Sequence, residues 1–211
     1  TSTIRSAVTL DGTAFWMAGT GGVNYAPLGN TGTSNQLATL NTRVLRISNS
    51  QLVVTSASGI NIGVNKVGTG LPTSGLQTVS LWNGLTPADG YGCFFLYLDA
   101  SIPGNDLVYI ANNANGLFKY SFDGTSWTQR GSLTGTTSSV AARISGASIE
   151  LFVTVGTGSG NSIRRITDAA AYNANITGNG SALTAVGSLV STAPANTAFR
   201  GVAFAPVATP Q

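Results

Sequence analysis

The chain has 211 residues, of which 42% are hydrophobic and 8% are charged, and its net charge is +3. This composition excludes a disordered chain and is enough to bury a core in one large all-β domain or two small ones. Histidine is absent and cysteine occurs once. These two counts exclude Ser-His-Asp and Cys-His catalysis, histidine-based zinc sites and an internal disulfide framework.

The charge distribution and the hydropathy narrow the choice of partners. The ten basic residues are spread along the chain, and Arg164-Arg165 is the only adjacent pair. Nucleic-acid-binding proteins usually cluster Lys and Arg with aromatic residues between them, so we predict no nucleic-acid partner. No apolar run approaches the roughly 18 residues that a membrane span requires, so we predict no span. A sequence rich in Thr, Ser and Asn and poor in Lys is typical of an extracellular or cell-surface protein.

The predicted elements are short β-strands that recur in one order: a strand, a turn at Asp, Asn or Gly, and further antiparallel strands. In chain order, the first copy comprises IRSAVTL, AFWMAG and VNYAPL, and the second comprises RVLRIS, LVVTSA and INIGVN. The third comprises CFFLYLDA, LVYIA, LFKYSF and TSWTQRGS, with a hairpin signal at Asp123-Gly124. The fourth comprises VAARIS, IELFVTV and SIRRITD. The last stretch, AFRGVAFAP, repeats only the first strand of a copy.

The spacing of these copies indicates the architecture. The residue six positions before the first turn of each copy is, in order, Arg5, Arg43, Cys93, Val140 and Arg200. The average spacing is about 49 residues, and a repeat of roughly 40 to 50 residues that contains four strands is typical of a propeller blade. A β-sandwich or a β-solenoid is the alternative, but a sandwich does not require recurrence over this distance.

We therefore predict an all-β fold, a β-propeller of four-stranded antiparallel blades with about four complete blades and one extra innermost strand. The chain is expected to be a single propeller domain or the C-terminal portion of a propeller of about six to seven blades. A second chain or an N-terminal segment would complete that larger ring and protect its open edges. A closed four-bladed ring, in which Ile4–Leu10 and Phe199–Pro206 compete for one position, is the alternative. The predicted blades and the closing strand occupy residues 1–40, 41–90, 91–137, 138–195 and 196–207.

Three stretches, GVNYAP, AFRGVAFAP and DLVYIANNANGLFKYSFDG, resemble NHL-type propeller repeats of bacterial secreted or surface proteins. The resemblance spans nearly the whole chain and concerns the fold, not an activity. Asp11 keeps the acidic turn residue of the repeat, whereas Asn49, Gly146 and Pro206 stand at the corresponding places. The resemblance implies that the Gly-Val-Ala-type strand is the innermost strand of each blade.

Three arginines share one register of the repeat. Arg5, Arg43 and Arg200 lie at the start of predicted innermost strands, so in a propeller they would surround one mouth of the central channel. There they could bind a carboxylate, sulfate or phosphate group through bidentate hydrogen bonds. The alternative is structural, in which each arginine binds backbone carbonyls and ties adjacent blades together. Cys93 and Val140 occupy the two remaining equivalent positions.

Two tryptophans are candidates for stacking on sugars. Trp82 and Trp127 fall on predicted outer strands, where a partly exposed indole could contact a glycan. The alternative is packing between blades, which is the commoner use of a propeller tryptophan.

Other reactive side chains offer little chemistry. Most carboxylates lie beside Gly, Asn or Ser, where Asp caps turns, and Cys93 sits in an apolar strand where a thiol is inert. No cofactor is predicted, because the DGT and GND loops lack the regular series of carboxylates that calcium requires. The sequence therefore predicts a non-enzymatic extracellular binding, adhesion or structural module that recognises a glycan or protein partner. The alternative is a propeller enzyme of the lactonase or polysaccharide-lyase kind, with carboxylates or a metal at the channel mouth.

Overall fold

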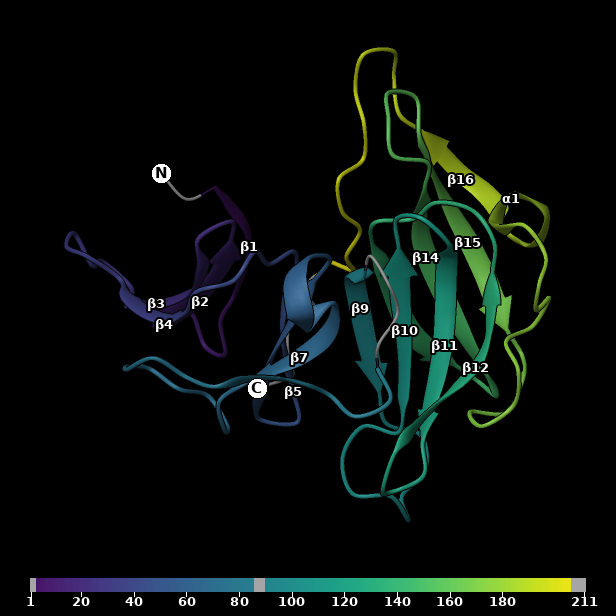
Figure 1. The fold of residues 1–211 in the computed structure, drawn as a ribbon. Coiled ribbons are helices and arrows are strands. Elements are labelled where there is room, and N and C mark those ends of the chain that lie inside the picture. Colours follow the sequence, from purple (N-terminus) through teal and green to yellow (C-terminus); the bar gives the residue numbers. More distant parts are fainter. Residues whose placement is uncertain (1–2, 86–89, 206–211) are drawn as a thin grey trace, which may run out of the picture.

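The computed structural model describes residues 3–85 and 90–205. These residues form four four-stranded antiparallel sheets, each with its strands in chain order, and we call the sheets blades 1 to 4 (Figure 1). Blade 1 contains β1 (Ile4–Val8), β2 (Ala14–Gly19), β3 (Gly22–Pro27) and β4 (Asn35–Ala38). Blade 2 contains β5 (Leu45–Ser48), β6 (Gln51–Ser56), β7 (Gly63–Val67) and β8 (Val79–Leu81). Blade 3 contains β9 (Gly90–Leu96), β10 (Leu107–Asn112), β11 (Gly116–Phe122) and β12 (Trp127–Leu133). Blade 4 contains β13 (Val140–Ser145), β14 (Ser148–Val155), β15 (Ser162–Asp168) and β16 (Ser188–Thr192).

The two helical elements are single turns in the connections. They are η1 (Gly59–Asn61) and α1 (Leu183–Val186). In the described ranges, no helix has the length and apolar character needed to cross a membrane.

Local turn chemistry sets the strand boundaries. The hairpin between β5 and β6 has positive φ angles at both Asn49 (48°) and Ser50 (57°), the backbone of the two-residue turns that suit the twist of antiparallel strands. Gly146 (φ 61°) and Gly124 (φ 96°) supply the same freedom after β13 and β11. The predicted turns at these positions are therefore confirmed.

Successive blades pack face to face through apolar clusters. Trp16 and Val23 of blade 1 meet Leu52 and Val54 of blade 2 in one cluster of buried side chains. A second cluster joins blades 2 and 3 and a third joins blades 3 and 4, so each blade covers the face of the next. The prediction of an all-β, propeller-like arrangement of four-stranded blades is confirmed. The total of six to seven blades and the expected domain organisation stay predictions.

The segment after blade 4 differs from the predicted closing strand. Within the described part of residues 196–205 no strand is assigned, and Pro206 and the residues after it lie outside the described ranges. The segment nevertheless lies along blade 4, because Asn161 both donates to and accepts from the Phe199 backbone, at 2.9 and 2.8 Å. Val202 N donates to Ser139 Oγ at 3.1 Å. These bonds between the segment and blade 4 involve side chains and do not form a ladder of backbone hydrogen bonds, so the segment is not a β-strand.

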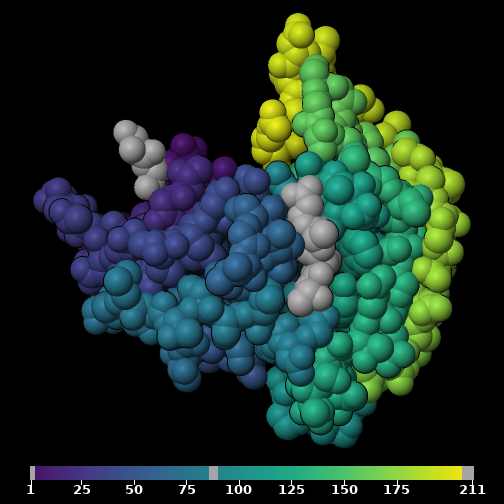
Figure 2. Space-filling view, in the orientation of Figure 1, coloured from purple at the N-terminus to yellow at the C-terminus, as the bar shows by residue number. Residues whose placement is uncertain are grey.

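Part of this segment projects from the blades. The turn between β14 and β15 and the chain that follows β16 rise together above the blades in the space-filling view (Figure 2). The Gly160 amide donates to the Thr197 carbonyl at 3.0 Å and joins the two.

Candidate anion-binding site between the blades

A cavity of about 400 Å³ is lined by residues from every repeat of the chain. We call it the axial cavity, because all four blades and the segment 199–205 contribute to it. The lining residues are Arg5, Arg43, Val44, Tyr91, Asn113, Ser138, Thr157, Phe199 and Arg200. The structure therefore brings together the three arginines that the repeat register singled out.

Arg5 lies on β1 and lines the axial cavity, and one nitrogen of its guanidinium is hydrogen-bonded within the protein. Its Nη1 donates to Asn41 Oδ1 at 2.6 Å and to the Thr42 carbonyl at 2.7 Å. Burial and then the charge of Arg43 lower the pKa of Arg5. Part of the expected structural role is thus present, because Arg5 ties β1 to the link between blades 1 and 2.

Arg43 lies just before β5, and its guanidinium stacks on an aromatic ring from the next blade. Its Cζ is 4.7 Å from the centre of the Tyr91 ring, a cation–π arrangement. Backbone contacts with Thr55 fix this segment, since Arg43 N donates to the Thr55 carbonyl at 2.8 Å. Arg43 Nε is buried and has no hydrogen-bond partner among the described residues. A buried donor in this state costs about 1–3 kcal/mol and is a candidate for a ligand acceptor.

Arg200 is the most weakly held of the three. It is exposed, and its one recorded hydrogen bond, from Nη1 to the Thr157 carbonyl, is 3.5 Å long. Its backbone is positioned by the Asn161–Phe199 contacts described above. The Arg200 guanidinium therefore has donors available to a molecule that enters the axial cavity.

Within residues 3–85 and 90–205, no carboxylate is paired with any of these three arginines. The ion pairs found in the described residues join Lys119 to Asp168 and both Arg143 and Arg165 to Glu150, and none of these residues lines the axial cavity. The described lining residues include no carboxylate. An anion in the axial cavity would meet three guanidinium groups, which bind carboxylate, sulfate and phosphate well.

Sequence reasoning missed the six lining residues other than the arginines, among them Tyr91 and Ser138. Cys93 and Val140 hold the equivalent repeat positions but are fully buried, whereas Tyr91 and Ser138, two residues earlier in each case, line the axial cavity. In blade 3 the pairing of β9 with β10 shifts register between Cys93 and Gly90, which displaces Tyr91 relative to a regular strand. The sequence feature that pointed to this site in blade 3 was the aromatic residue Tyr91, two positions before the repeat position held by Cys93.

The chain's other carboxylates have structural partners. Asp11, Asp99 and Asp123 each accept a hydrogen bond from the backbone amide two residues further on. The pKa of each group is lowered, first by a bond from the Thr13 hydroxyl for Asp11, from the Ser101 hydroxyl for Asp99 and from the Ser126 amide for Asp123, and then by those amides. Asp106 accepts from the Leu98 amide at 2.9 Å and closes the loop between β9 and β10. Asp89 lies outside the described residues.

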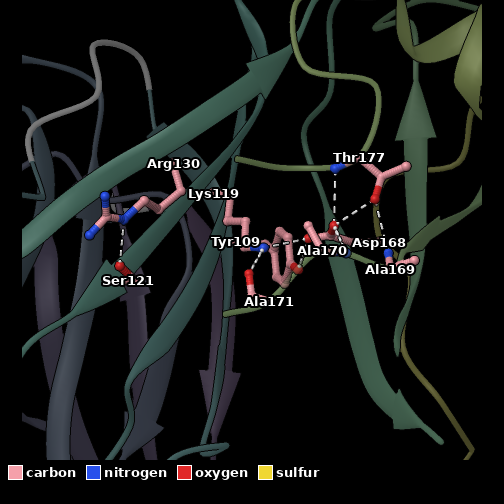
Figure 3. A network of polar contacts seen from close by, with 9 residues as sticks. All are labelled: Tyr109, Lys119, Ser121, Arg130, Asp168, Ala169, Ala170, Ala171 and Thr177. Atoms are coloured by element: carbon pink, nitrogen blue, oxygen red, sulfur yellow. Dashed lines mark hydrogen bonds and ion pairs between the residues drawn. The ribbon is translucent and has the colours of Figure 1, made fainter. Parts of the chain in front are cut away.

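Asp168 belongs to a buried polar cluster that joins blades 3 and 4 (Figure 3). Its Oδ2 lies 2.9 Å from Lys119 Nζ and accepts from the Tyr109 hydroxyl at 2.6 Å, and Thr177 N donates to its Oδ1 at 3.0 Å. Burial raises the pKa of Asp168, but hydrogen bonds from Lys119, Tyr109 and Thr177 outweigh it, so the pKa is lowered. Each of these side chains is at most 1% exposed except Thr177, so the cluster has no route to a substrate.

The prediction for Trp127 was wrong. Its ring is 4% exposed and packs against Trp82, Phe95 and Phe122 at centroid distances of 5.9, 5.9 and 5.2 Å. The ring turns inward to the cluster between blades 2 and 3, where an apolar indole gains more from burial than from solvent. Trp82 is half-buried and lines a separate cavity.

The Cys93 thiol is buried and unreactive. Burial raises the pKa of the Cys93 thiol to about 11, so the thiol is protonated and unreactive at neutral pH. Across residues 3–85 and 90–205, no three His, Cys, Asp or Glu side chains gather closely enough to hold a metal ion. The absence of a cofactor stays a prediction.

Comparisons with known proteins add little to this picture. No family model matches the chain. No curated protein matches it. Among solved structures, the chain is similar to a thermostable family-43 glycoside hydrolase, with a TM-score of 0.48 and 8% identity over 85% of this chain and 73% of that one. The four sheets themselves define the class: the chain is an all-β protein of propeller-like, four-stranded blades.

Proposed function

We propose that the chain is a non-enzymatic binding module, extracellular or at a cell surface, that holds an anionic group of a glycan or protein partner in the axial cavity. The observation that carries the proposal is the convergence of Arg5, Arg43 and Arg200 on one cavity without a carboxylate among its described lining residues.

Charge balance supports an anionic ligand. Arginines without a counter-charge repel one another, and the charge of Arg43 is the second cause, after burial, of the lowered pKa of Arg5. An anion would remove the repulsion and satisfy free donors such as Arg43 Nε. Polar neighbours, among them Ser138, supply further hydrogen bonds to a sulfate or carboxylate.

The alternative of a propeller enzyme predicts a different lining. A lactonase-like or polysaccharide-lyase-like site would present convergent carboxylates or a metal at the channel mouth. The described lining residues include no carboxylate, and the six described carboxylates elsewhere are engaged in turns and ion pairs. These facts favour binding over catalysis.

The test compares wild type with the double variant Arg43→Gln/Arg200→Gln. Sulfate and glucuronate are titrated by calorimetry and by thermal unfolding. At a ligand concentration of 100 times Kd, we expect a stabilisation of about 2.7 kcal/mol, which raises Tm by about 5–11 °C in a domain of this size. The variant should lose at least ten-fold in affinity for both anions.

A control that removes a positive charge away from the axial cavity separates a site from a general charge effect. Arg130→Gln removes one positive charge and one hydrogen bond, to Ser121 Oγ at 2.8 Å, away from the axial cavity. It should leave anion affinity unchanged. The proposal fails if Arg43→Gln/Arg200→Gln lowers Tm but keeps wild-type affinity for sulfate and glucuronate.

A further inference from the structure

A second cavity, of about 200 Å³, lies between blades 2 and 3 and shares no residue with the axial cavity. We call it the Trp82 cavity. Its lining residues are Ser48, Asn49, Gln51, Lys66, Trp82, Pro103, Gly104, Asn105 and Phe122.

The aromatic wall of the Trp82 cavity is rigid. One side of the Trp82 ring stacks on Phe95 at 5.4 Å with an interplanar angle of 28°. Trp127 meets Trp82 edge-on at 5.9 Å and Phe122 at 5.2 Å. Because Phe95 and Trp127 belong to the core between the blades, they fix the indole in place while it stays half-buried at the cavity.

The opposite wall is made of amides. Asn105 Nδ2 donates to Ser48 Oγ at 2.7 Å, which docks the β9–β10 loop of blade 3 on the β5–β6 turn of blade 2. Gln51 is also committed, since its Oε1 accepts from Gly70 N at 3.1 Å. Asn49 lies against Gly104, where a Cβ would come within 2.6 Å of its Nδ2.

Two polar groups in this wall are free to bind. The Asn49 side chain makes no hydrogen bond to any described residue, and Lys66 Nζ has neither a hydrogen bond nor an ion pair in the ranges 3–85 and 90–205. The described lining includes no carboxylate that would neutralise Lys66. The wall therefore offers an amide that can donate and accept and an ammonium that can donate.

We propose that the Trp82 cavity binds a single pyranose ring of a glycan. The electron-rich face of an aromatic ring attracts the polarised C–H bonds on one face of a sugar, and amides and an ammonium match its hydroxyl groups. The volume is below the roughly 300–1,000 Å³ of cavities for drug-sized ligands, which suits one ring rather than an oligosaccharide. This site is independent of the anion proposed for the axial cavity.

The test uses nuclear magnetic resonance, because single-sugar sites bind weakly. Methyl glucoside, methyl galactoside and glucuronate are titrated into ¹⁵N-labelled protein to 50 mM, roughly the range that a Kd near 10 mM requires. We expect a saturable shift of the Trp82 indole N–H signal with at least one of these sugars. The buried Trp127 signal should move less.

Asn49→Gly removes the amide at a position whose positive φ of 48° glycine tolerates. Ser50→Gly is the matched control, since Ser50 (φ 57°) belongs to the same turn but does not line the cavity. Asn49→Gly and Lys66→Gln should each weaken binding by at least three-fold, and Ser50→Gly should not. A larger effect of Lys66→Gln on glucuronate than on methyl glucoside would place the sugar carboxylate at Lys66.

Two results would overturn the proposal. One is the absence of a saturable indole shift with all three sugars. The other is binding that Asn49→Gly and Lys66→Gln leave unchanged while Arg43→Gln/Arg200→Gln abolishes it, since the sugar would then occupy the axial cavity. If Arg43→Gln/Arg200→Gln loses anion binding but keeps sugar binding, the proposal for the Trp82 cavity still holds.

Discussion

Replacing the buried lysine of blade 3 tests how blades 3 and 4 are joined. Lys119→Met keeps most of the side-chain volume but leaves Asp168 without its cation. Lys119 is 1% exposed and also donates to the Ala171 carbonyl at 2.9 Å, so its loss removes this hydrogen bond as well as the buried ion pair. Removing one partner of a buried ion pair costs about 3–5 kcal/mol. In a domain of this size that loss lowers Tm by about 6–20 °C.

The stability lost in Lys119→Met should depend on pH, and the pKa of Asp168 fixes the direction of that dependence. The pKa of Asp168 is lowered in the folded wild type. The ionised carboxylate therefore contributes to stability at pH values above its unfolded-state pKa of about 3.9, and this contribution is lost as the pH falls through its folded-state pKa. In Lys119→Met, burial stays the largest influence and the lowering contribution of Lys119 is gone, so we expect the pKa of Asp168 to rise above the unfolded value. The variant therefore recovers stability on acidification, and the two stability curves converge below about pH 4.

Urea unfolding from pH 4 to 8, followed by circular dichroism, measures this difference. Lys66→Met is the matched control, because Lys66 has no ion-pair partner among the described residues, and it should change stability by less than about 0.5 kcal/mol. The double variant Lys119→Met/Asp168→Asn removes both charges and should regain part of the loss. A loss below about 1 kcal/mol at pH 7, or one that is constant with pH, would refute the reasoning.

Three further predictions follow from the contacts described above. Asn161→Ala removes both hydrogen bonds to Phe199, so amide exchange in the segment 199–205 should accelerate at least ten-fold; unchanged exchange would show that Asn161 does not hold the segment. Cys93 should resist iodoacetamide at pH 8 in the folded protein and react on unfolding, and rapid labelling of the native thiol would contradict its burial. Native mass spectrometry should find this chain with a second polypeptide if another chain completes the ring, and the mass of one chain alone would count against that prediction.

The repeating strands were predictable because their signals are local. The stretch LVYIA is apolar throughout, and the corresponding strand β10 is buried at every position between two blades. Asn49-Ser50 is a turn signal that needs no knowledge of the rest of the chain. The outermost strands β4, β8 and β16 were weaker in sequence, since β16 is exposed at every position and thus carries no alternating pattern.

The side-chain partners were not predictable, because they depend on how strands from distant parts of the sequence meet. Lys119 and Asp168 are separated by 49 positions and pair only because blades 3 and 4 pack face to face. Trp127 lies on an outer strand as predicted, but the sequence does not say which face of that strand is buried. Tyr91 entered the axial cavity through an irregularity in β9, and such bulges have no reliable signal in a single sequence.

The gathering of three arginines around one cavity strengthens the case for an external anion. The buried Lys119 is paired with Asp168, and the half-exposed Arg143 and Arg165 share Glu150. The other basic side chains have no ion pair among the described residues, but Arg5, Arg43 and Arg200 are set apart because they line the same cavity. Like charges gathered in this way repel one another unless a counter-charge lies between them. The counter-charge is therefore expected from a ligand, and the affinity of wild type for sulfate should fall steeply with added sodium chloride, because chloride competes for the same guanidinium groups.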